Sequence, residues 1–381
     1  MRRWPLLLAV LCVSSASLAA QNAPPRPWDF SALLVGNFQL RTDSAAEATT
    51  GGPPASRFDL TRAYLTFRAP AGDRASVRIT TDVFQNAAAG YYGGWAIRLK
   101  YGILQYDLTR QLAGIQGLGA VARIGMLQTV VIEHVESFWP RWLGTSAAET
   151  HGFFSSADIG AATLLTFPGR NGEAYLTITN GPGYQAPEPD RFKDVAARFS
   201  FTPFANDSGA GLLRAFTISP WYYNGNTASA FVLGGGAQVG PVSDGVRRDR
   251  RGVFAGLRDR KLTLGAEFAQ RLEEIESGAN TVASPRAVRD RTSNLASAFA
   301  IVRPLELLGS AARSRLGVVG RVDQFKLDTD AAPSNRLVIL GGTWELNDRT
   351  SIAVDYQGFS PRNNPVGVPT RSWFLHWTAA F

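Results

Sequence analysis

The chain ends in the stretch RSWFLHWTAAF, residues Arg371 to Phe381, and this stretch decides the fold class. Every second residue in it is apolar, and the residues between them are mixed in character. The apolar set is Trp373, Leu375, Trp377, Ala379 and Phe381, and the mixed set is Phe374, His376, Thr378 and Ala380. A period of two predicts a β-strand with one apolar face. In a soluble β-sandwich a second sheet would cover such a face, whereas in a membrane lipid would cover it.

The terminal phenylalanine, preceded by alternate apolar residues, is similar to the last strand of bacterial outer-membrane barrels. In those barrels this strand is the signal that the barrel-assembly machinery reads. The resemblance therefore implies a role in barrel closure and assembly for four residues: Trp373, Leu375, Trp377 and Phe381. Aromatic residues such as these are typical of the membrane interface, with the apolar face toward outer-membrane lipid. An edge strand of a soluble sandwich remains the alternative at this point.

The N-terminus predicts export. Arg2 and Arg3 precede an apolar run over residues 5–13, and small residues follow at 17–19. This pattern is typical of a cleaved signal peptide, which we assign to residues 1–19 and to the Sec pathway. Residues 20–28 form a short lead, and residues 29–381 form one barrel domain. The only cysteine, Cys12, lies within the signal peptide, so the mature chain is expected to hold no thiol.

The composition favours strands over helices. No segment after the leader approaches the run of about 18 apolar residues that a membrane helix needs. Charged residues make up 18% of the chain, below the roughly 25% that is usual for a soluble domain. Glycine is abundant, with 38 residues, and 11% of the chain is aromatic. Arginine dominates the basic residues, which suits guanidinium groups that meet anions or pair with carboxylates. We predict no nucleic-acid partner.

Several internal runs show the same alternation. Residues 75–84, 95–103, 262–269 and 352–357 each have one apolar and one polar or charged face. Two other runs fit less well. Phe58 and Leu60 share their parity with Arg62 and Arg68, and residues 294–303 fit neither register. Either β-bulges or local contacts with loops would explain these departures.

The connections between strand-like runs alternate between short and long. The short ones lie at 69–73, 169–172, 205–211, 259–260 and 347–349, with longer turns at 110–117 and 305–314. The long ones lie at 43–56, 86–94, 128–157, 181–190, 224–250, 278–289 and 361–369. Short turns at one rim and long loops at the other predict an all-β transmembrane antiparallel barrel of about sixteen strands. Because the interior of such a barrel is wide, we expect the third long loop, 128–157, to fold inward.

Five short stretches resemble the phosphate-selective porin O and P family of the bacterial outer membrane. They are residues 58–68, 76–82, 123–125, 155–160 and 179–184. The resemblance implies a sixteen-stranded, usually trimeric barrel. It also implies that the third loop constricts an aqueous channel lined by basic residues and that small anionic or neutral solutes, phosphate among them, pass through it passively.

The polar faces of the early strands carry a set of cations. We predict that they line the lumen: Arg62, Arg68, Arg78, Arg98, Lys100 and Arg123. A basic wall raises the local anion concentration and repels cations. The alternative is that these groups pair with lumenal carboxylates such as Asp82 and Glu267.

The third loop carries more acid than base. Its charged residues are Glu133, Glu136, Arg141 and Glu149, which we assign to the constriction. An acidic loop opposite a basic wall is more typical of a general diffusion porin without anion preference, which is the second interpretation. The acidic residues of the loop argue against specificity for phosphate.

The sequence offers little for catalysis or metal binding. His134 and His151 lie in the third loop, but their spacing matches no ligand motif, and His376 is expected to be a polar lumenal residue. No G-x-S-x-G motif is present. We therefore predict no catalytic residue, no metal and no cofactor. An outer-membrane barrel enzyme, such as a phospholipase, is the alternative from a different class.

Overall fold

The computed structural model describes residues 28–43, 56–85, 94–112, 114–230, 245–278, 281, 283–309, 314–330, 334–361 and 369–381. The predicted signal peptide, Cys12 and nearly all of the short lead lie outside these residues. Seventeen strands are described, of which sixteen are long and one, β10, has three residues. None of the helices in these ranges is long and apolar enough to cross a membrane.

The first nine strands are β1 (Asp29–Arg41), β2 (Ser56–Pro70), β3 (Ala75–Gln85), β4 (Trp95–Asp107), β5 (Gly119–Gln128), β6 (Ala157–Thr166), β7 (Gly172–Thr179), β8 (Asp194–Phe201) and β9 (Phe216–Asn224). The others are β10 (Asn226–Ala228), β11 (Gly245–Arg258), β12 (Leu262–Ser277), β13 (Ala287–Val302), β14 (Leu316–Lys326), β15 (Ser334–Glu345), β16 (Thr350–Pro361) and β17 (Thr370–Ala380). Short helices lie in the connections: η1 (Thr109–Leu112), α2 (Ile132–Glu136), η2 (Arg141–Leu143), α3 (Ala147–Thr150), η3 (Pro168–Arg170), η4 (Ser208–Ala215) and α5 (Pro304–Leu307).

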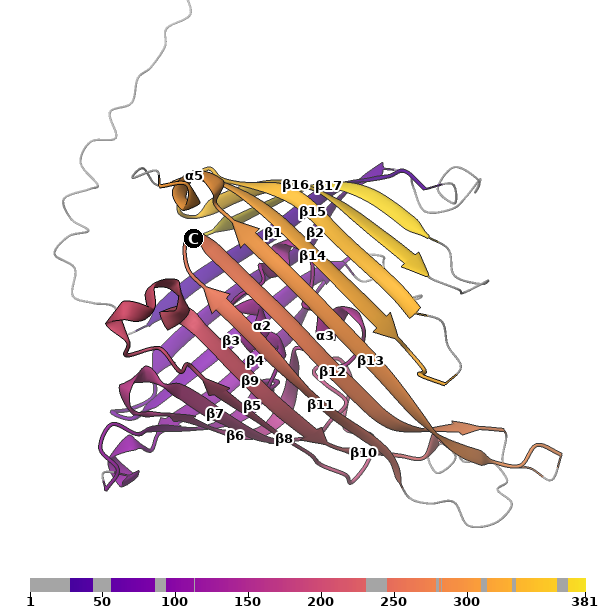
Figure 1. Cartoon of the computed structure of the whole chain (residues 1–381). Helices are drawn as coiled ribbons and strands as arrows, with labels where there is room; N and C mark the ends of the chain where they lie inside the picture. The colour runs from indigo at the N-terminus through magenta and orange to yellow at the C-terminus, as the bar shows by residue number, and fades with distance from the viewer. Residues whose placement is uncertain are drawn as a thin grey trace, which may run out of the picture.

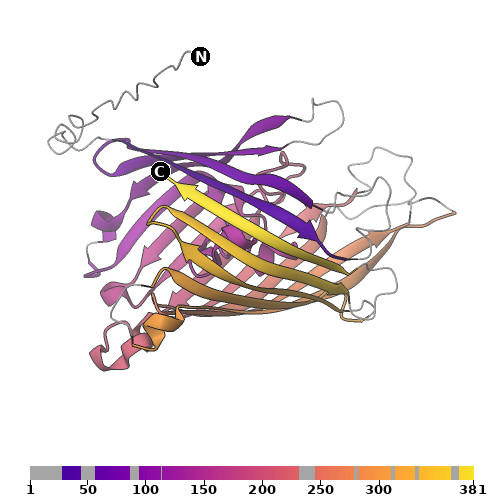
Figure 2. The ribbon, with the colours of Figure 1, turned by 90° about the horizontal axis from the view of Figure 1, so that it is seen from above.

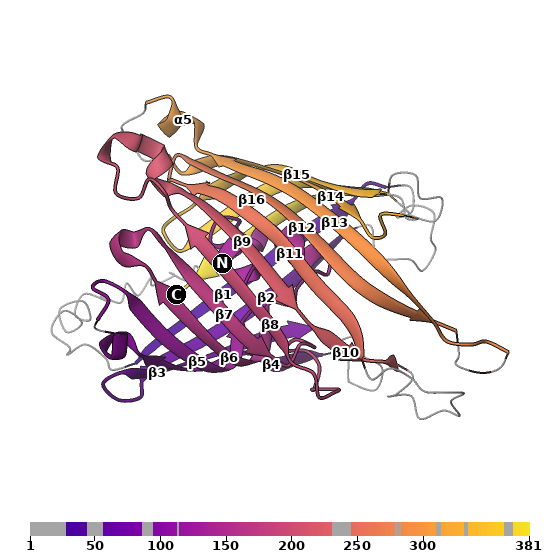
Figure 3. The same cartoon turned by 60° about the horizontal axis from the view of Figure 1, so that its bottom comes forward.

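The sheet closes on itself. All neighbouring strands are antiparallel, and β1 pairs with both β2 and the C-terminal β17. β9 pairs with β8 and β11, and β10 adds three residue pairs to β11. The ring of tilted strands is visible from three directions in Figures 1, 2 and 3. The prediction of a closed antiparallel barrel of about sixteen strands is confirmed.

Burial in this barrel is the reverse of that in a soluble domain. On β14, Leu316 and Val318 are exposed on the outer face, while Arg321 and Asp323 are buried on the inner face. Large exposed apolar side chains recur around the ring, including Ile97 at 69% exposure. Charged groups are almost never fully buried in soluble proteins unless they are paired. The alternation predicted for 75–84, 262–269 and 352–357 follows this division of faces.

The C-terminal strand follows the predicted pattern. Trp373 and Leu375 are exposed, whereas His376, between Leu375 and Trp377, is buried inside. Trp377 lies directly opposite Gly36 of β1, and a Cβ atom on Gly36 would fall within 2.3 Å of the indole ring. Phe381 extends the pairing, because its backbone exchanges hydrogen bonds with Ala32. The two ends of the barrel therefore meet along this seam.

Two β-bulges change the predicted faces. The β1–β2 register shifts at Val35/Gly36, which places Phe58 and Arg62 on opposite faces and explains their shared parity in the sequence. The β3–β4 register shifts at Thr80/Thr81, opposite Lys100. The uniform alternation predicted for 95–103 is therefore wrong beyond Lys100. Tyr101 and Ile103 are each 6% exposed, on the inner side.

The third loop lies inside the barrel, as predicted. Figure 1 shows α2 and α3 enclosed by the ring of strands. The loop and the facing strands share a continuous apolar core that includes Trp139, Leu143, Phe254, Leu295 and Phe299. This core also explains the poor periodicity of residues 294–303, since Leu295 and Phe299 are apolar residues on the inner face of β13.

Candidate functional site

The third loop is held to the wall by side chains that donate to its backbone carbonyls. On one side, Nη1 of Arg198 lies 3.2 Å from the carbonyl oxygen of Val130. Three further donors come from β12, β14 and β16. They are Arg271 to Gly152 (2.9 Å), Arg321 to Thr145 (2.5 Å) and Gln357 to Leu143 (2.9 Å). The carbonyls of an irregular segment need such partners away from water, so these bonds fix the loop across the lumen.

Aromatic packing covers one half of the inner wall. The ring of Trp139 lies 5.3 Å from that of Phe299, and the ring of Phe138 lies 4.9 Å from that of Phe254. His134 contacts the same region edge-on and shares a hydrogen bond of 2.9 Å with Ser219. Burial lowers the pKa of His134 to about 3, so this residue is neutral at ordinary pH. The loop therefore fills the lumen beside β11–β15.

The opposite half of the inner wall is lined by neighbouring cavities. The outer vestibule, about 650 Å³, reaches Gln85 at the long-loop end of β3. The inner vestibule, about 530 Å³, reaches Arg349 and Phe381 at the short-turn end. Both vestibules are lined by Leu33, Tyr64 and Arg141. These three residues therefore lie at the boundary between the two.

Lysine and tyrosine form the wall side of this boundary. The ammonium of Lys100 donates to the hydroxyl of Tyr64 at 2.8 Å and lies 4.2 Å from the centre of its ring. The ring of Tyr101 is 5.5 Å from the same ammonium and 4.5 Å from the guanidinium of Arg78. Aromatic faces stabilise cations electrostatically, so the two tyrosines help to hold positive charge on the inner wall.

The loop side of the boundary is a compact charge cluster. Arg141 donates to both Glu136 and Glu149, with Nη2 lying 2.8 Å from Oε1 of Glu149. Burial raises the pKa of Glu136 against the opposing effect of Arg141. Glu133 instead faces the wall, 3.4 Å from Nη1 of Arg78. Much of the loop's predicted acidity is therefore offset locally.

Arg98 pairs with a fully buried carboxylate on the neighbouring strand. It lies directly opposite Asp82 in the β3–β4 register and donates two hydrogen bonds to it, at 3.0 and 2.7 Å. Its guanidinium also lies over the rings of Phe84 and Tyr184. For this residue the alternative of pairing with a lumenal carboxylate is the one observed, and it contributes little net charge to the lumen.

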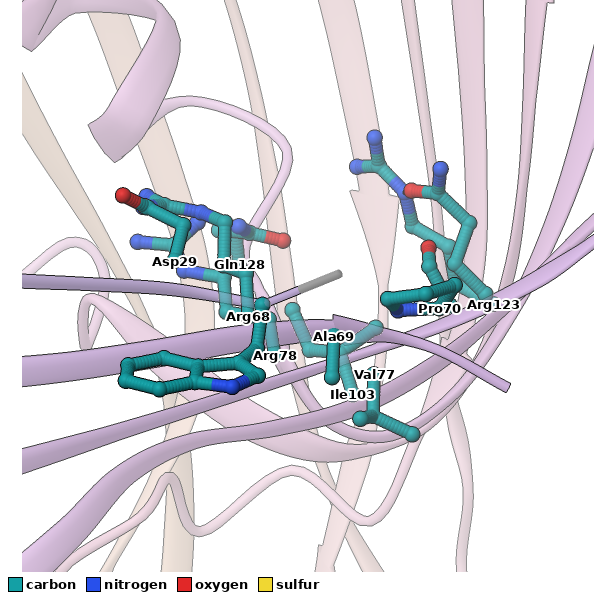
Figure 4. A pocket seen from close by; sticks show the side chains of 12 residues that line it. Asp29, Arg68, Ala69, Pro70, Val77, Arg78, Ile103, Arg123 and Gln128 are labelled. Atoms are coloured by element: carbon teal, nitrogen blue, oxygen red, sulfur yellow. The ribbon is translucent and has the colours of Figure 1, made fainter. Parts of the chain in front are cut away.

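Three arginines line a further cavity of about 520 Å³ at the short-turn end. Figure 4 shows the side chains of Arg68, Arg78 and Arg123 on the same side of the strand ribbons. Arg68 and Arg78 are direct cross-strand neighbours. Two like charges in this position destabilise the sheet unless nearby carboxylates offset them. Asp29 lies 3.1 Å from Arg68, and Glu133 offsets Arg78. Arg123 donates to the neutral side chain of Gln105 at 3.1 Å.

Arg62 and the remaining histidines complete the predicted set. Arg62 lines the outer vestibule and donates to the backbone oxygen of Thr61. His151 and His376 each lie beside one buried carboxylate, Asp323 and Asp355 respectively. Within the described part of the chain, no three histidine, cysteine or acidic residues are grouped closely enough to hold a metal ion.

Sequence reasoning missed several residues of this site. Tyr64 shares the parity of Arg62 and Arg68, so the alternation already indicated its position. Tyr101 was hidden by the bulge at Lys100. The loop anchors Arg198, Arg271 and Arg321 lie on inward positions, but no sequence signal identifies carbonyl groups more than 60 residues away as their partners.

Comparison with solved structures shows the fold. An anion-selective porin from Comamonas acidovorans superposes with a TM-score of 0.59 at 12% identity, covering 93% of this chain and 99% of that one. The outer membrane channel DcaP of Acinetobacter baumannii gives 0.58 at 11% identity, covering 93% and 97%. OmpF of Salmonella typhi, in complex with daunomycin, gives 0.59 at 14% identity with the same coverage. No family model and no curated protein sequence matches this chain.

Proposed function

We propose that this protein is a bacterial outer-membrane porin through which small hydrophilic solutes diffuse passively, with a preference for anions such as phosphate. The observation that carries the proposal is the excess of cations along the open half of the lumen. Arg62, Arg78, Lys100 and Arg123 line successive cavities there. A positive potential within low-dielectric walls concentrates anions. Since porins conduct without chemistry, the proposal assigns no catalytic residue.

The setting of the proposed channel follows from its outer face. Exposed apolar side chains around the ring suit outer-membrane lipid, and export through the Sec pathway would precede insertion. The likeness to solved porins supports this location, as does the C-terminal strand, to which we assign recognition by the assembly machinery. We also propose a homotrimer. An apolar groove on the outer face, lined by Leu104, Ile124 and Leu176 among others, supports contact with a second copy.

The second candidate is a general diffusion porin without anion preference. Glu133, Glu136 and Glu149 on the loop favour it, since they bring negative charge into the same region of the lumen. The two candidates differ in the net field at the boundary between the vestibules. They therefore predict different ion selectivity rather than different conductance.

Reversal potentials in planar bilayers separate the candidates. The purified chain in a KCl gradient should favour chloride. Arg78→Gln with Arg123→Gln should lower the chloride-over-potassium permeability ratio by about twofold for each charge, because screening keeps each contribution below about 1 kcal/mol. Arg110→Gln, in the η1 turn, is the matched control. Equal permeability of both ions in the unmodified protein would instead favour the general porin, and absence of conductance would exclude both.

A further inference from the structure

The outer vestibule combines a cation with an aromatic lining. Its apolar side includes Leu60, Phe84, Trp142 and Phe374, which come from two neighbouring strands, the third loop and the C-terminal strand. A channel for small, strongly hydrated anions gains nothing from such a surface, since apolar side chains cannot replace lost water contacts. The lining instead fits a solute that carries both apolar surface and charge.

Arg62 is the group in this vestibule that is available to an anion. Its hydrogen bond within the described residues goes to the backbone oxygen of the preceding Thr61, at 3.2 Å, and no described carboxylate lies within ion-pair distance. A guanidinium has five N–H donors. Asp59 also lines the vestibule, but it lies 3.6 Å from Arg57, which offsets its charge.

The aromatic rings form a corner where the third loop meets β17 of the wall. Phe374 stacks on His376 with the ring centres 5.1 Å apart and an interplanar angle of 15°. Trp142 of the third loop meets His376 edge-on at 6.3 Å. Flat rings fixed in this way offer stacking and edge contacts to another ring.

We infer that the outer vestibule is a binding site for aromatic carboxylates. The ring of the solute packs against Trp142 and Phe374, and the carboxylate binds Arg62 through paired hydrogen bonds. The cavity of about 650 Å³ is ample for such a molecule and lies within the usual range for small-molecule sites. Arg141 lines both vestibules and is the next cation along the path. This inference rests on the proposed channel function and adds aromatic carboxylates to the anions that the channel admits.

The test uses the full chain in planar bilayers, with benzoate as the probe and acetate and phosphate as comparisons. Benzoate should reduce the chloride current with a half-effect near about 1 mM, as a weakly held solute would. Acetate and phosphate should need at least about tenfold more, because neither uses the aromatic corner. Equal effects of benzoate and acetate would overturn the inference while leaving the channel proposal intact. Absence of chloride current would overturn the channel proposal itself.

Variants separate the charge from the rings. Arg62→Gln should weaken the benzoate effect by about tenfold, the typical value of a charge-assisted hydrogen bond. Phe374→Leu should weaken it by about threefold and leave the acetate effect unchanged. Arg62→Lys, which keeps the charge but loses the planar fork, should fall between the unmodified protein and Arg62→Gln. Far-ultraviolet circular dichroism dominated by β-structure reports that each variant has folded, and the benzoate effect is measured relative to each variant's own chloride current. A benzoate effect that survives both Arg62→Gln and Phe374→Leu would overturn the site.

Discussion

Both halves of the barrel wall carry apolar side chains on the outer face, but the residues on their inner faces differ. Along β11–β15, inward positions hold apolar residues such as Phe254, Leu295 and Phe299, and the third loop packs on them. Along β2–β5, inward positions hold cations and tyrosines that line cavities. The outer face must be apolar everywhere, so only the inner face is free to vary. Its composition decides whether the lumen is filled or open.

Arginine takes a different role in each half. In the covered half, Arg271 and Arg321 donate to carbonyl groups of the loop and so hold it in place. In the open half, the cavities are lined by Arg62 and Arg123, whose bonds are to neutral groups. The difference lies in what is opposite each guanidinium. A loop backbone converts the residue into a structural anchor, whereas a guanidinium beside a cavity has no loop carbonyl to hold.

Removing the apolar core of the covered half should change stability and conductance the most. Trp139→Ala deletes a side chain that is 1% exposed and packed on Phe299. The expected cost is about 3–5 kcal/mol of unfolding free energy, from lost transfer energy and the cavity left behind. Because the loop then loses much of its apolar support and depends more on its hydrogen bonds to the wall, single-channel conductance should also rise. Urea unfolding followed by fluorescence, together with single-channel recording, measures both effects.

Trp344→Ala is the control for that experiment. Trp344 lies on β15 in the same half of the barrel but is 49% exposed. Its loss should leave conductance unchanged, since it lies outside the loop core. Unchanged stability and conductance in Trp139→Ala would contradict the assignment of this core as the support of the loop.

Removing one anchor should have a smaller effect. Arg321→Gln loses the bond to Thr145 and the pairing with Asp323. Asp323 keeps His151 and Ser297 as partners, so the cost should be limited to about 2–3 kcal/mol. The loop should fluctuate, which single-channel recordings would detect as more frequent closures. A quiet channel of unaltered stability would show that the core alone fixes the loop.

The fold was largely predictable because the outer face repeats one requirement on every strand. The alternation on β3, β12 and β17 placed their faces correctly. It failed on β4 beyond Lys100, because a bulge adds one residue without any signature in the alternation. It also failed on β13, where Leu295 is apolar on the inner face because a loop more than 100 residues earlier covers it.

The site was predictable only in part. Parity identified residues on inward positions, but partners depend on register and on the third loop. Arg78 and Arg98 look equivalent in the sequence. The register places Asp82 opposite Arg98 and Arg68 opposite Arg78, so Arg98 has its carboxylate on the neighbouring strand, whereas Arg78 has Glu133 on the third loop. The carboxylate that offsets the charge of each arginine could therefore not be inferred from alternation alone.

That difference in pairing predicts a contrast within the open half. Arg98→Gln leaves Asp82 buried without its ion-pair partner, so the chloride-over-potassium permeability ratio should fall by about twofold for the added negative charge. Arg98→Gln combined with Asp82→Asn removes both charges and should restore the original ratio. Reversal potentials check both variants. A double variant as altered as the single one would mean that Arg98 acts on solutes directly.

The smallest expected effect concerns the pH dependence of the loop's charge cluster. Glu136 loses its negative charge below its pKa, which burial has raised. The lumen then becomes more positive, so anion preference should increase as the pH falls from neutral through this raised pKa. The change should be less than about twofold, because Glu149 keeps its bonds to Arg141. Glu136→Gln should show the higher preference already at neutral pH and should lack the step attributed to Glu136. If that step persisted in the variant, Glu136 would not be the group that titrates.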